Sequence, residues 1–284
     1  MQIQNALTVD VEDYFQVSAF AESIKPHEWD NHPLRVEKNT HKVLDLFDDY
    51  QIKATFFVLG WVAERRPDLV LEIARRGHEV ACHGYSHQLI YNQSKDVFRQ
   101  ETIRAKKILE DIVQRPVRGY RAASYSITRR SLWALDILAE AGFEYDSSIF
   151  PVRHDRYGIP GSPKFPYILD TPAGHKLVEF PISTAKFMGY HLPVAGGGYF
   201  RLYPYWLSRA GLRQINRKKK PFIFYLHPWE VDPDQPRISA SRLSRFRHYN
   251  NLDKCESRLR SLASDFKFTT VEKVLQSQGI LPAC

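Results

Sequence analysis

The chain has 284 residues, of which 43% are hydrophobic, 13% aromatic and 25% charged. This composition is typical of a globular protein and excludes a disordered or fibrous chain, and the length is common for one α/β barrel domain. The formal net charge of +8 favours an acidic partner, such as nucleic acid, an anionic membrane surface or an anionic glycan, although a solvated basic surface is the simpler explanation.

The N-terminus and the cysteines bear on the compartment. Residues 1–15 enter a strand-like run without a secretion leader, and no stretch reaches the roughly 18 uninterrupted apolar residues of a membrane span. Three widely spaced cysteines, Cys82, Cys255 and Cys284, match neither a disulfide framework nor a zinc ribbon, so reduced thiols are expected. We therefore expect a cytoplasmic protein that can also make peripheral contact with the surface of an anionic membrane.

Short β-rich runs alternate with helical patterns from the start of the chain. Strands are predicted at 5–11, 54–60, 79–84, 117–123 and 221–227. Strands that alternate with helices predict a parallel sheet, open or closed into a barrel. In such folds functional residues gather at the carboxyl ends of the strands.

Helices are predicted between these strands. The segment 67–77 begins with a proline in its first turn and ends in Gly77, and the segment 128–142 repeats apolar residues at helical spacing and ends in Gly142. Residues 151–200 break the alternation with many glycines and prolines. They predict a long loop or hairpin excursion over the sheet.

Three carboxylates follow the first strand within four residues, Asp10, Glu12 and Asp13. Carboxylates packed this closely repel one another, and a nearby cation relieves the repulsion. The alternative is a solvated acidic turn, which is a common feature. On its own, this cluster is a weak indication of a cation site.

Two histidines follow the third strand, at His83 and His87. Imidazoles four residues apart can converge on one ion if the segment turns into a helix, and neutral imidazole is the commonest protein ligand of zinc. A lone histidine is more often a satisfied surface or core group. The pair at the end of a strand favours a metal.

Two further polar residues end predicted strands, Arg121 and His227. An arginine here can pair with a carboxylate, and a histidine after a buried strand is placed to exchange protons with a substrate. Each also has an ordinary structural explanation, as a rim cap or a loop contact. Their joint occurrence with the carboxylates and the histidine pair indicates one site.

Five motifs follow one another in an order that resembles the polysaccharide deacetylases with the NodB homology domain, also called carbohydrate esterase family 4: TVDVED, HGYSH, RAASY, YDSS and YLHP. The resemblance implies a distorted (β/α) barrel. We expect residues 1–284 to form a single catalytic domain, with a motif-bearing core at about 5–230 and a C-terminal family extension at about 231–284. The runs GGGYFRLYP, HPWEVDPDQPR and FRHYNNLD are similar to the branch found in exopolysaccharide clusters linked to exosortase.

The resemblance implies a metal centre with a base beside it. His83 and His87 would bind a divalent ion, with zinc expected and other transition ions as alternatives. The third ligand would be a carboxylate of the first motif, either Glu12 by its spacing or Asp13 if the loop curls. Asp10 would be the general base that takes a proton from the attacking water.

The resemblance also implies roles around the metal. Arg121 would bond to Asp10, and His227 would protonate the departing amine. The backbone N–H of Ser124 would help to hold the oxyanion. Asp146 would orient the rim, and Leu226 would line a pocket for the acetyl methyl group.

The third motif departs from the usual family pattern. Ala123 occupies the position of a typical proline, which would loosen the loop that carries the oxyanion donor. The tryptophan found in many peptidoglycan-type members is also missing from the fourth motif. Tyr125, Trp229 or Tyr199 could supply an aromatic surface instead, although ordinary packing is the simpler role for each.

The predicted function is a metal-dependent hydrolase that removes N-acetyl groups from N-acetylhexosamine units of an exopolysaccharide or its lipid-linked precursor. Two alternatives share the barrel: an amidohydrolase that acts on a cyclic amide or a formylated amino sugar, and a catalytically silent glycan-binding protein. No basic-aromatic motif or zinc-finger spacing supports a nucleic-acid partner. The oligomeric state stays open.

Basic residues are concentrated in two places outside these motifs. One run, 217–220, precedes the last predicted strand, and a later helical stretch carries Arg242, Arg245, Arg247, Arg258 and Arg260. They could touch an anionic lipid or glycan, although most such runs are solvated faces.

Overall fold

The first predicted strand lies in the middle of the sheet. In the computed structural model, which describes residues 3–154 and 156–282, β1 (Gln4–Val11) is buried at every position after Gln4. It pairs in parallel with β10 (Ile223–Leu226) on one side and β2 (Thr55–Val58) on the other, and its first residues also pair with β11 (Lys267–Thr269). A parallel strand covered on both faces has no solvent side, which explains its nearly unbroken apolar run.

Beyond β2 the sheet continues almost in chain order, with β3 (Glu79–Cys82), β4 (Gly119–Tyr120), β5 (Tyr145–Asp146), β7 (Lys176–Glu179) and β6 (Tyr167–Asp170). All of these neighbours are parallel except β6, which pairs antiparallel with β7. Within the described pairings β10 and β6 are the two edges, so hydrogen bonds do not close the barrel. The predicted α/β fold of the distorted-barrel type is confirmed.

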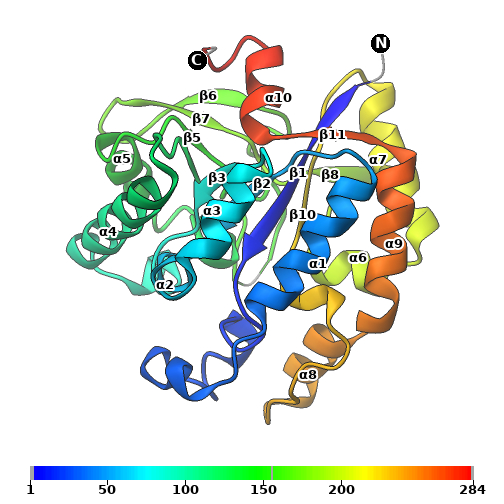
Figure 1. Ribbon diagram of the computed structural model, residues 1–284. Helices are drawn as coiled ribbons and strands as arrows, with labels where there is room; N and C mark the ends of the chain where they lie inside the picture. Colours follow the sequence, from blue (N-terminus) through cyan, green and yellow to red (C-terminus); the bar gives the residue numbers. More distant parts are fainter. Residues whose placement is uncertain (1–2, 155, 283–284) are drawn as a thin grey trace.

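Helices are arranged around this sheet, as Figure 1 shows. They are α1 (Val36–Asp49), α2 (Gly60–Arg65), α3 (Pro67–Arg75), α4 (Lys95–Val113), α5 (Trp133–Glu140), α6 (Gly197–Leu202), α7 (Tyr205–Arg217), α8 (Arg242–Tyr249), α9 (Leu252–Asp265) and α10 (Val271–Ser277). None of the helices in the described ranges is long and apolar enough to cross a membrane.

The longest helix, α4, illustrates how the sequence builds these elements. Ser94 caps its start, because the Ser94 hydroxyl accepts a hydrogen bond from the N–H of Val97. Its buried residues are Phe98, Thr102, Ala105 and Leu109, which share one face of the helix at the expected spacing. That face packs on α2, α3 and β3.

The Gly- and Pro-rich excursion contains two hairpins. One is the β6–β7 pair, and the other is a separate sheet of β8 (Thr184–Phe187) and β9 (Tyr190–Pro193). The predicted hairpins at 151–200 are present, but only β8–β9 lies outside the main sheet, because β6 and β7 extend that sheet, and α6 already begins at Gly197. Strand β7 returns to the main sheet beside β5.

Some element bounds differ from the predicted ones. The helix predicted at 128–142 is shorter, because residues before Trp133 form turns in which the Ser131 hydroxyl bonds to Ser126 O and accepts from Thr128 N. The C-terminal segment contributes β11 beside β1, so it is part of the sheet. Cys82 and Cys255 are buried free thiols, as expected, whereas Cys284 lies outside the described residues.

Candidate active site

A carboxylate and two imidazoles converge at the carboxyl ends of β1 and β3. Glu12 follows β1 directly and His83 follows β3, and one ligand atom from each of Glu12, His83 and His87 lies within 4.8 Å of the others. Glu12 is held beside β1 by the hydrogen bond from its N–H to Asp10 O, at 3.0 Å. The predicted convergence of these three residues is present.

His83 is oriented by the next strand in the sheet. Its Nδ1 lies 2.8 Å from the carbonyl oxygen of Arg121, which leaves Nε2 for the cluster. The side chain is buried, and this burial lowers the pKa of His83 to about 4. A neutral imidazole is the form that binds a metal ion.

His87 reaches the cluster from a loop, so the two imidazoles converge without the helical turn that would also have brought them together. Gly84 and His87 have φ of 74° and 51°, in the left-handed region, which breaks any regular helix. The loop carbonyls are used elsewhere: Gly84 O accepts from Gly60 N at 2.8 Å and Tyr85 O from Trp61 N at 3.2 Å. These bonds cap the first turn of α2.

The atoms of this cluster suit a divalent ion. Glu12 Oε2 lies 2.8 Å from His87 Nε2, yet it accepts no hydrogen bond from any described residue, and His87 Nδ1 is also buried without a partner among them. Burial opposes ionisation, but His87, His227 and His83 hold the pKa of Glu12 below its usual range. Two imidazoles and one ionised carboxylate form a donor set for zinc that leaves positions for water and substrate.

Asp13, the alternative third ligand, lies outside the cluster. Its Oδ2 accepts hydrogen bonds from Arg35 N (2.7 Å) and Val36 N (2.9 Å), and its Oδ1 accepts one from Tyr14 N (2.8 Å). Its side chain therefore holds the start of α1, where the backbone N–H groups have no partner within the helix. The loop does not curl to bring Asp13 to the histidines, and Glu12 is the carboxylate that lies beside them.

Asp10 is paired with a buried arginine, as predicted. Arg121 Nη1 donates to Asp10 Oδ1 at 2.6 Å and to Thr8 Oγ1 at 2.8 Å. The other side of the guanidinium donates to the carbonyl and the hydroxyl of Ser147, at 3.2 and 3.0 Å. The guanidinium is fully buried over the ring of Phe57. These bonds fix the direction of the Asp10 carboxylate.

His227 lies between three carboxylates at the end of β10. Its Nε2 is 3.9 Å from Asp10 Oδ2 and 3.6 Å from Glu12 Oε1, and its Nδ1 is 2.7 Å from Glu230 Oε1. Burial disfavours the imidazolium, but these carboxylates outweigh it and raise the pKa of His227 to about 9. The ring therefore carries a proton at neutral pH and can donate it.

Sequence reasoning missed the pair that supports His227. Glu230 Oε2 accepts from the buried Arg201 Nε at 2.6 Å, and Arg201 also bonds to the carbonyls of Arg247, His248 and Asn250. Burial opposes the ionisation of Glu230, yet Arg201 and His227 lower its pKa to about 2. The H-P-W-E motif carried a signal for this contact. A glutamate three residues after the residue that starts a helical turn can accept a hydrogen bond from the backbone N–H of that first residue, here His227.

Trp229 packs against two imidazole rings, those of His227 and His248. Its indole lies against His227 (5.0 Å between ring centroids) and against His248 (4.2 Å). Its Nε1 donates to Glu12 Oε1 at 3.1 Å. Trp229 thus aims the proposed metal carboxylate and provides one wall of the cavity.

The turn after Arg121 has an unusual backbone. Ser124 and Tyr125 have φ of 50° and 55°, a region that non-glycine residues seldom adopt. The Ser124 hydroxyl shares a 2.6 Å hydrogen bond with Ser18, whereas the N–H of Ser124 donates to none of the described residues. That N–H is available for a ligand, as the predicted oxyanion role requires.

Two other predicted substrate residues lie behind the cavity. Leu226 is buried in β10, because every side chain of that strand is covered. Asp146 is buried in β5, where it accepts from Ser148 Oγ and faces Glu179 of β7. Neither is among the residues that line the cavity, and the roles of Leu226 in an acetyl pocket and of Asp146 at the rim stay predictions.

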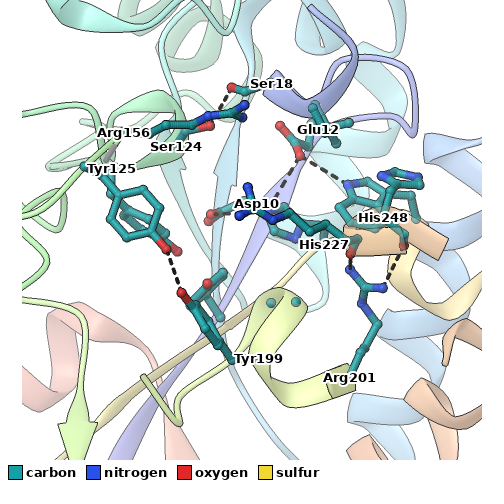
Figure 2. A pocket seen from close by; sticks show the side chains of 18 of the residues that line it. Asp10, Glu12, Ser18, Ser124, Tyr125, Arg156, Tyr199, Arg201, His227 and His248 are labelled. Carbon is teal, nitrogen blue, oxygen red and sulfur yellow. Dashed lines mark hydrogen bonds and ion pairs between the residues drawn. The ribbon is translucent and has the colours of Figure 1, made fainter. Parts of the chain in front are cut away.

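A cavity of about 420 Å³ opens over the cluster. Figure 2 shows Asp10, Glu12 and His227 near its centre, with Tyr125 and Tyr199 on one side and Arg201 and His248 on the other. Its wall is completed by residues of α6, α8 and the loop around Tyr157. A cavity of this size can take a sugar unit with its neighbours.

Two family models match the chain. Residues 28–145 match the model described as polysaccharide deacetylase, and residues 147–276 match a domain of unknown function, DUF3473. The two matches meet on either side of Asp146, the last residue of β5. Both matched segments and the residues before 28 contribute to the cavity.

Several relatives are named for deacetylation. A peptidoglycan-N-acetylglucosamine deacetylase of Bacillus cereus is 29% identical over 148 residues, covering 48% of this chain and 52% of the relative. A chitooligosaccharide deacetylase of Sinorhizobium fredii is 36% identical over 100 residues, covering 35% and 44%. The matched parts therefore span about half of these relatives' own length.

Solved structures share the fold over nearly the whole chain. A Mycobacterium smegmatis protein described as a polysaccharide deacetylase has a TM-score of 0.61 at 21% identity, covering 99% of this chain and 93% of that one. PuuE allantoinase has the same TM-score, 0.61, at 14% identity, covering 96% and 89%. These similarities establish the fold.

Proposed function

Since the chain belongs to the polysaccharide deacetylase family, we propose that it hydrolyses the N-acetyl groups of N-acetylhexosamine units with the help of a divalent metal ion. The observation that carries this proposal is the convergence of Glu12, His83 and His87 beside the Asp10–Arg121 pair. The relatives' names supply the substrate class, an N-acetylated glycan.

Glu12, His83 and His87 would hold the ion. When bound there, zinc would polarise the acetyl carbonyl and acidify the attacking water. Asp10, aimed by its hydrogen bond from Arg121, would take the proton of that water. The free N–H of Ser124 would donate to the developing oxyanion.

His227 would complete the reaction as the acid. Its protonated ring faces Asp10 and Glu12, and Glu230 fixes its Nδ1, so Nε2 is the atom that donates to the leaving amine. The products would be a free amino sugar and acetate. The exopolysaccharide, or its lipid-linked precursor, is the substrate that the sequence features of the C-terminal half favour.

The test measures acetate released from N-acetylglucosamine oligomers, with and without a chelator. We expect the wild type to release acetate, the chelator to stop it, and added zinc to restore it. Asp10→Asn should lower kcat by about 100- to 10,000-fold, the range for loss of a general base. The matched control, Asp68→Asn, changes an exposed carboxylate of α3 and should stay active. Release that a chelator leaves unchanged would contradict the mechanism.

A further inference from the structure

Helix α8 stands between two hollows. On one side Leu243, Phe246 and Arg247 line the cavity described above. On the other side is a second hollow of about 400 Å³, which we name the arginine groove, lined by Arg237, Arg242, Arg245, Phe246 and Tyr249. Because Phe246 lines both, the groove begins where the wall of the cavity ends.

The arginine groove carries uncompensated positive charge. Arg242 and Arg245 form no ion pair with any described residue, and no described carboxylate lines the groove. Arg237 donates to the carbonyl of Pro233 and lies over the ring of Tyr249, 4.3 Å from its centroid. Three guanidinium groups thus gather without an anion.

Some other surface arginines form ion pairs, whereas the exposed Arg75 and Arg217 form none with the described residues. Arg65 pairs with Asp30 at 2.7 Å, and Arg118 pairs with Glu144 at 2.6 Å. Arginines held together without such partners repel one another, and an anionic ligand would relieve that repulsion. The groove differs from a single unpaired arginine on a solvated face because Arg237, Arg242 and Arg245 line the same hollow.

We propose that the arginine groove binds an anionic group, a phosphate ester or a carboxylate, carried by the same glycan whose acetylated sugar occupies the cavity. This inference rests on the proposed function. Guanidinium groups bind phosphate and carboxylate with paired hydrogen bonds, which suits a cluster of arginines better than one of lysines. The enzyme would therefore prefer an acidic glycan over a neutral one.

The path from the cavity to the groove favours a glycan over a membrane surface. Phe246 is 55% exposed and presents a ring to both hollows, which a sugar unit can cover. Arg247 and Arg156 line the cavity itself, with no ion pair to the described residues, so positive charge continues along the path. A chain of linked sugars can follow such a path.

The experiment compares kcat/KM on three substrates: an N-acetylglucosamine tetramer, the same tetramer with a phosphate ester at its reducing end, and one that contains a uronate unit. For Arg242→Gln with Arg245→Gln, the ratio of acidic to neutral kcat/KM should fall about tenfold or more, as for loss of charge-assisted hydrogen bonds. The control, Lys218→Gln with Lys219→Gln, removes the same charge from an exposed site and should keep the ratio. The two acidic substrates show whether phosphate or carboxylate is preferred.

A binding measurement separates this inference from the proposed function. Calorimetry with Asp10→Asn and the phosphorylated tetramer needs no turnover, and the two groove substitutions should weaken that affinity about tenfold even if no acetate were ever released. An unchanged ratio together with unchanged affinity would overturn the inference. A second result would also overturn the inference. If the protein bound phosphatidylglycerol vesicles through the groove arginines and showed no preference among the tetramers, the groove would be assigned to a membrane.

Discussion

At the residue scale, the charge state of each site group is set by its neighbours. His83 and His227 are both buried imidazoles, yet the pKa of His83 is lowered to about 4 and that of His227 is raised to about 9. Burial is the largest influence on both, but His227 faces Glu12, Glu230 and Asp10 at close range. One histidine is therefore suited to bind a metal and the other to donate a proton.

The support of His227 by Glu230 predicts a shift in pH dependence. Glu230→Gln removes a negative charge that raises the pKa of His227, so the basic limb of the kcat/KM profile for acetate release should move to lower pH. The weaker orientation should also lower kcat about 10- to 100-fold. Glu22→Gln, on the exposed surface, is the matched control. A basic limb at the same pH in both variants would contradict the acid role of His227.

The position of Glu12 beside the two histidines predicts that its substitution weakens metal binding. Glu12→Gln keeps the size of the side chain but removes its charge, so the zinc content of purified protein should fall strongly while the Tm without metal changes little. Elemental analysis after dialysis checks the first part and thermal unfolding the second. Full zinc occupancy of Glu12→Gln would mean that the carboxylate is not a ligand.

At the scale of elements, three buried carboxyl groups support the fold. Asp13 ties the loop after β1 to the start of α1, and Asp146 and Glu179 face each other across β5 and β7. In the latter pair burial raises the pKa of Asp146 to about 6 and that of Glu179 well above its usual range. Like charges this close cannot both ionise at low cost.

The hydrogen bonds of Asp13 predict that replacing this residue lowers the stability of the fold but leaves the metal site in place. Asp13→Ala removes the acceptor for three backbone N–H groups, which should lower the free energy of unfolding by at least about 2 kcal/mol. Urea unfolding measures this change, and zinc titration of the folded variant should show the wild-type stoichiometry. Loss of zinc from a folded Asp13→Ala would restore Asp13 as a candidate ligand.

The Asp146–Glu179 pair predicts how stability depends on pH. Unfolded carboxyls lose their protons near pH 4, whereas this pair holds protons to higher pH, so its contribution to stability falls as the pH rises from about 4 through 6 and beyond. Glu179→Gln should therefore raise the Tm by a few degrees at pH 8 and have little effect at pH 4. Thermal scans across this range test it, and an equal Tm change at both pH values would contradict the shared proton.

At the scale of the whole molecule, the second matched segment contributes strands to the main sheet and a wall to the cavity. Strand β10 lies beside β1, β11 pairs with its first residues, and α8 completes the cavity. The proposal that residues 1–284 are one domain predicts that a chain ending at residue 230 cannot fold, because it loses β11 and the buried face of α9, which includes Leu252, Leu259 and Leu262. Circular dichroism and heat unfolding check this, and a cooperative transition in the short chain would contradict it.

The sequence by itself determined the parallel α/β class and the strands that carry the site, because buried strands and amphipathic helices leave local patterns. It also located Asp10, His83, His87, Arg121 and His227, since each follows an apolar run whose end faces the site. Tertiary structure alone decided between Glu12 and Asp13, because the choice depends on which carboxylate the distant backbone of Arg35 and Val36 occupies. The same reason applies to Arg201, whose acceptors on Glu230 and on the backbone of α8 are brought to it only by tertiary packing. The arginine groove is an intermediate case, because Arg242, Arg245, Phe246 and Tyr249 share one face of α8 at a spacing that the sequence already shows, and the structure adds Arg237.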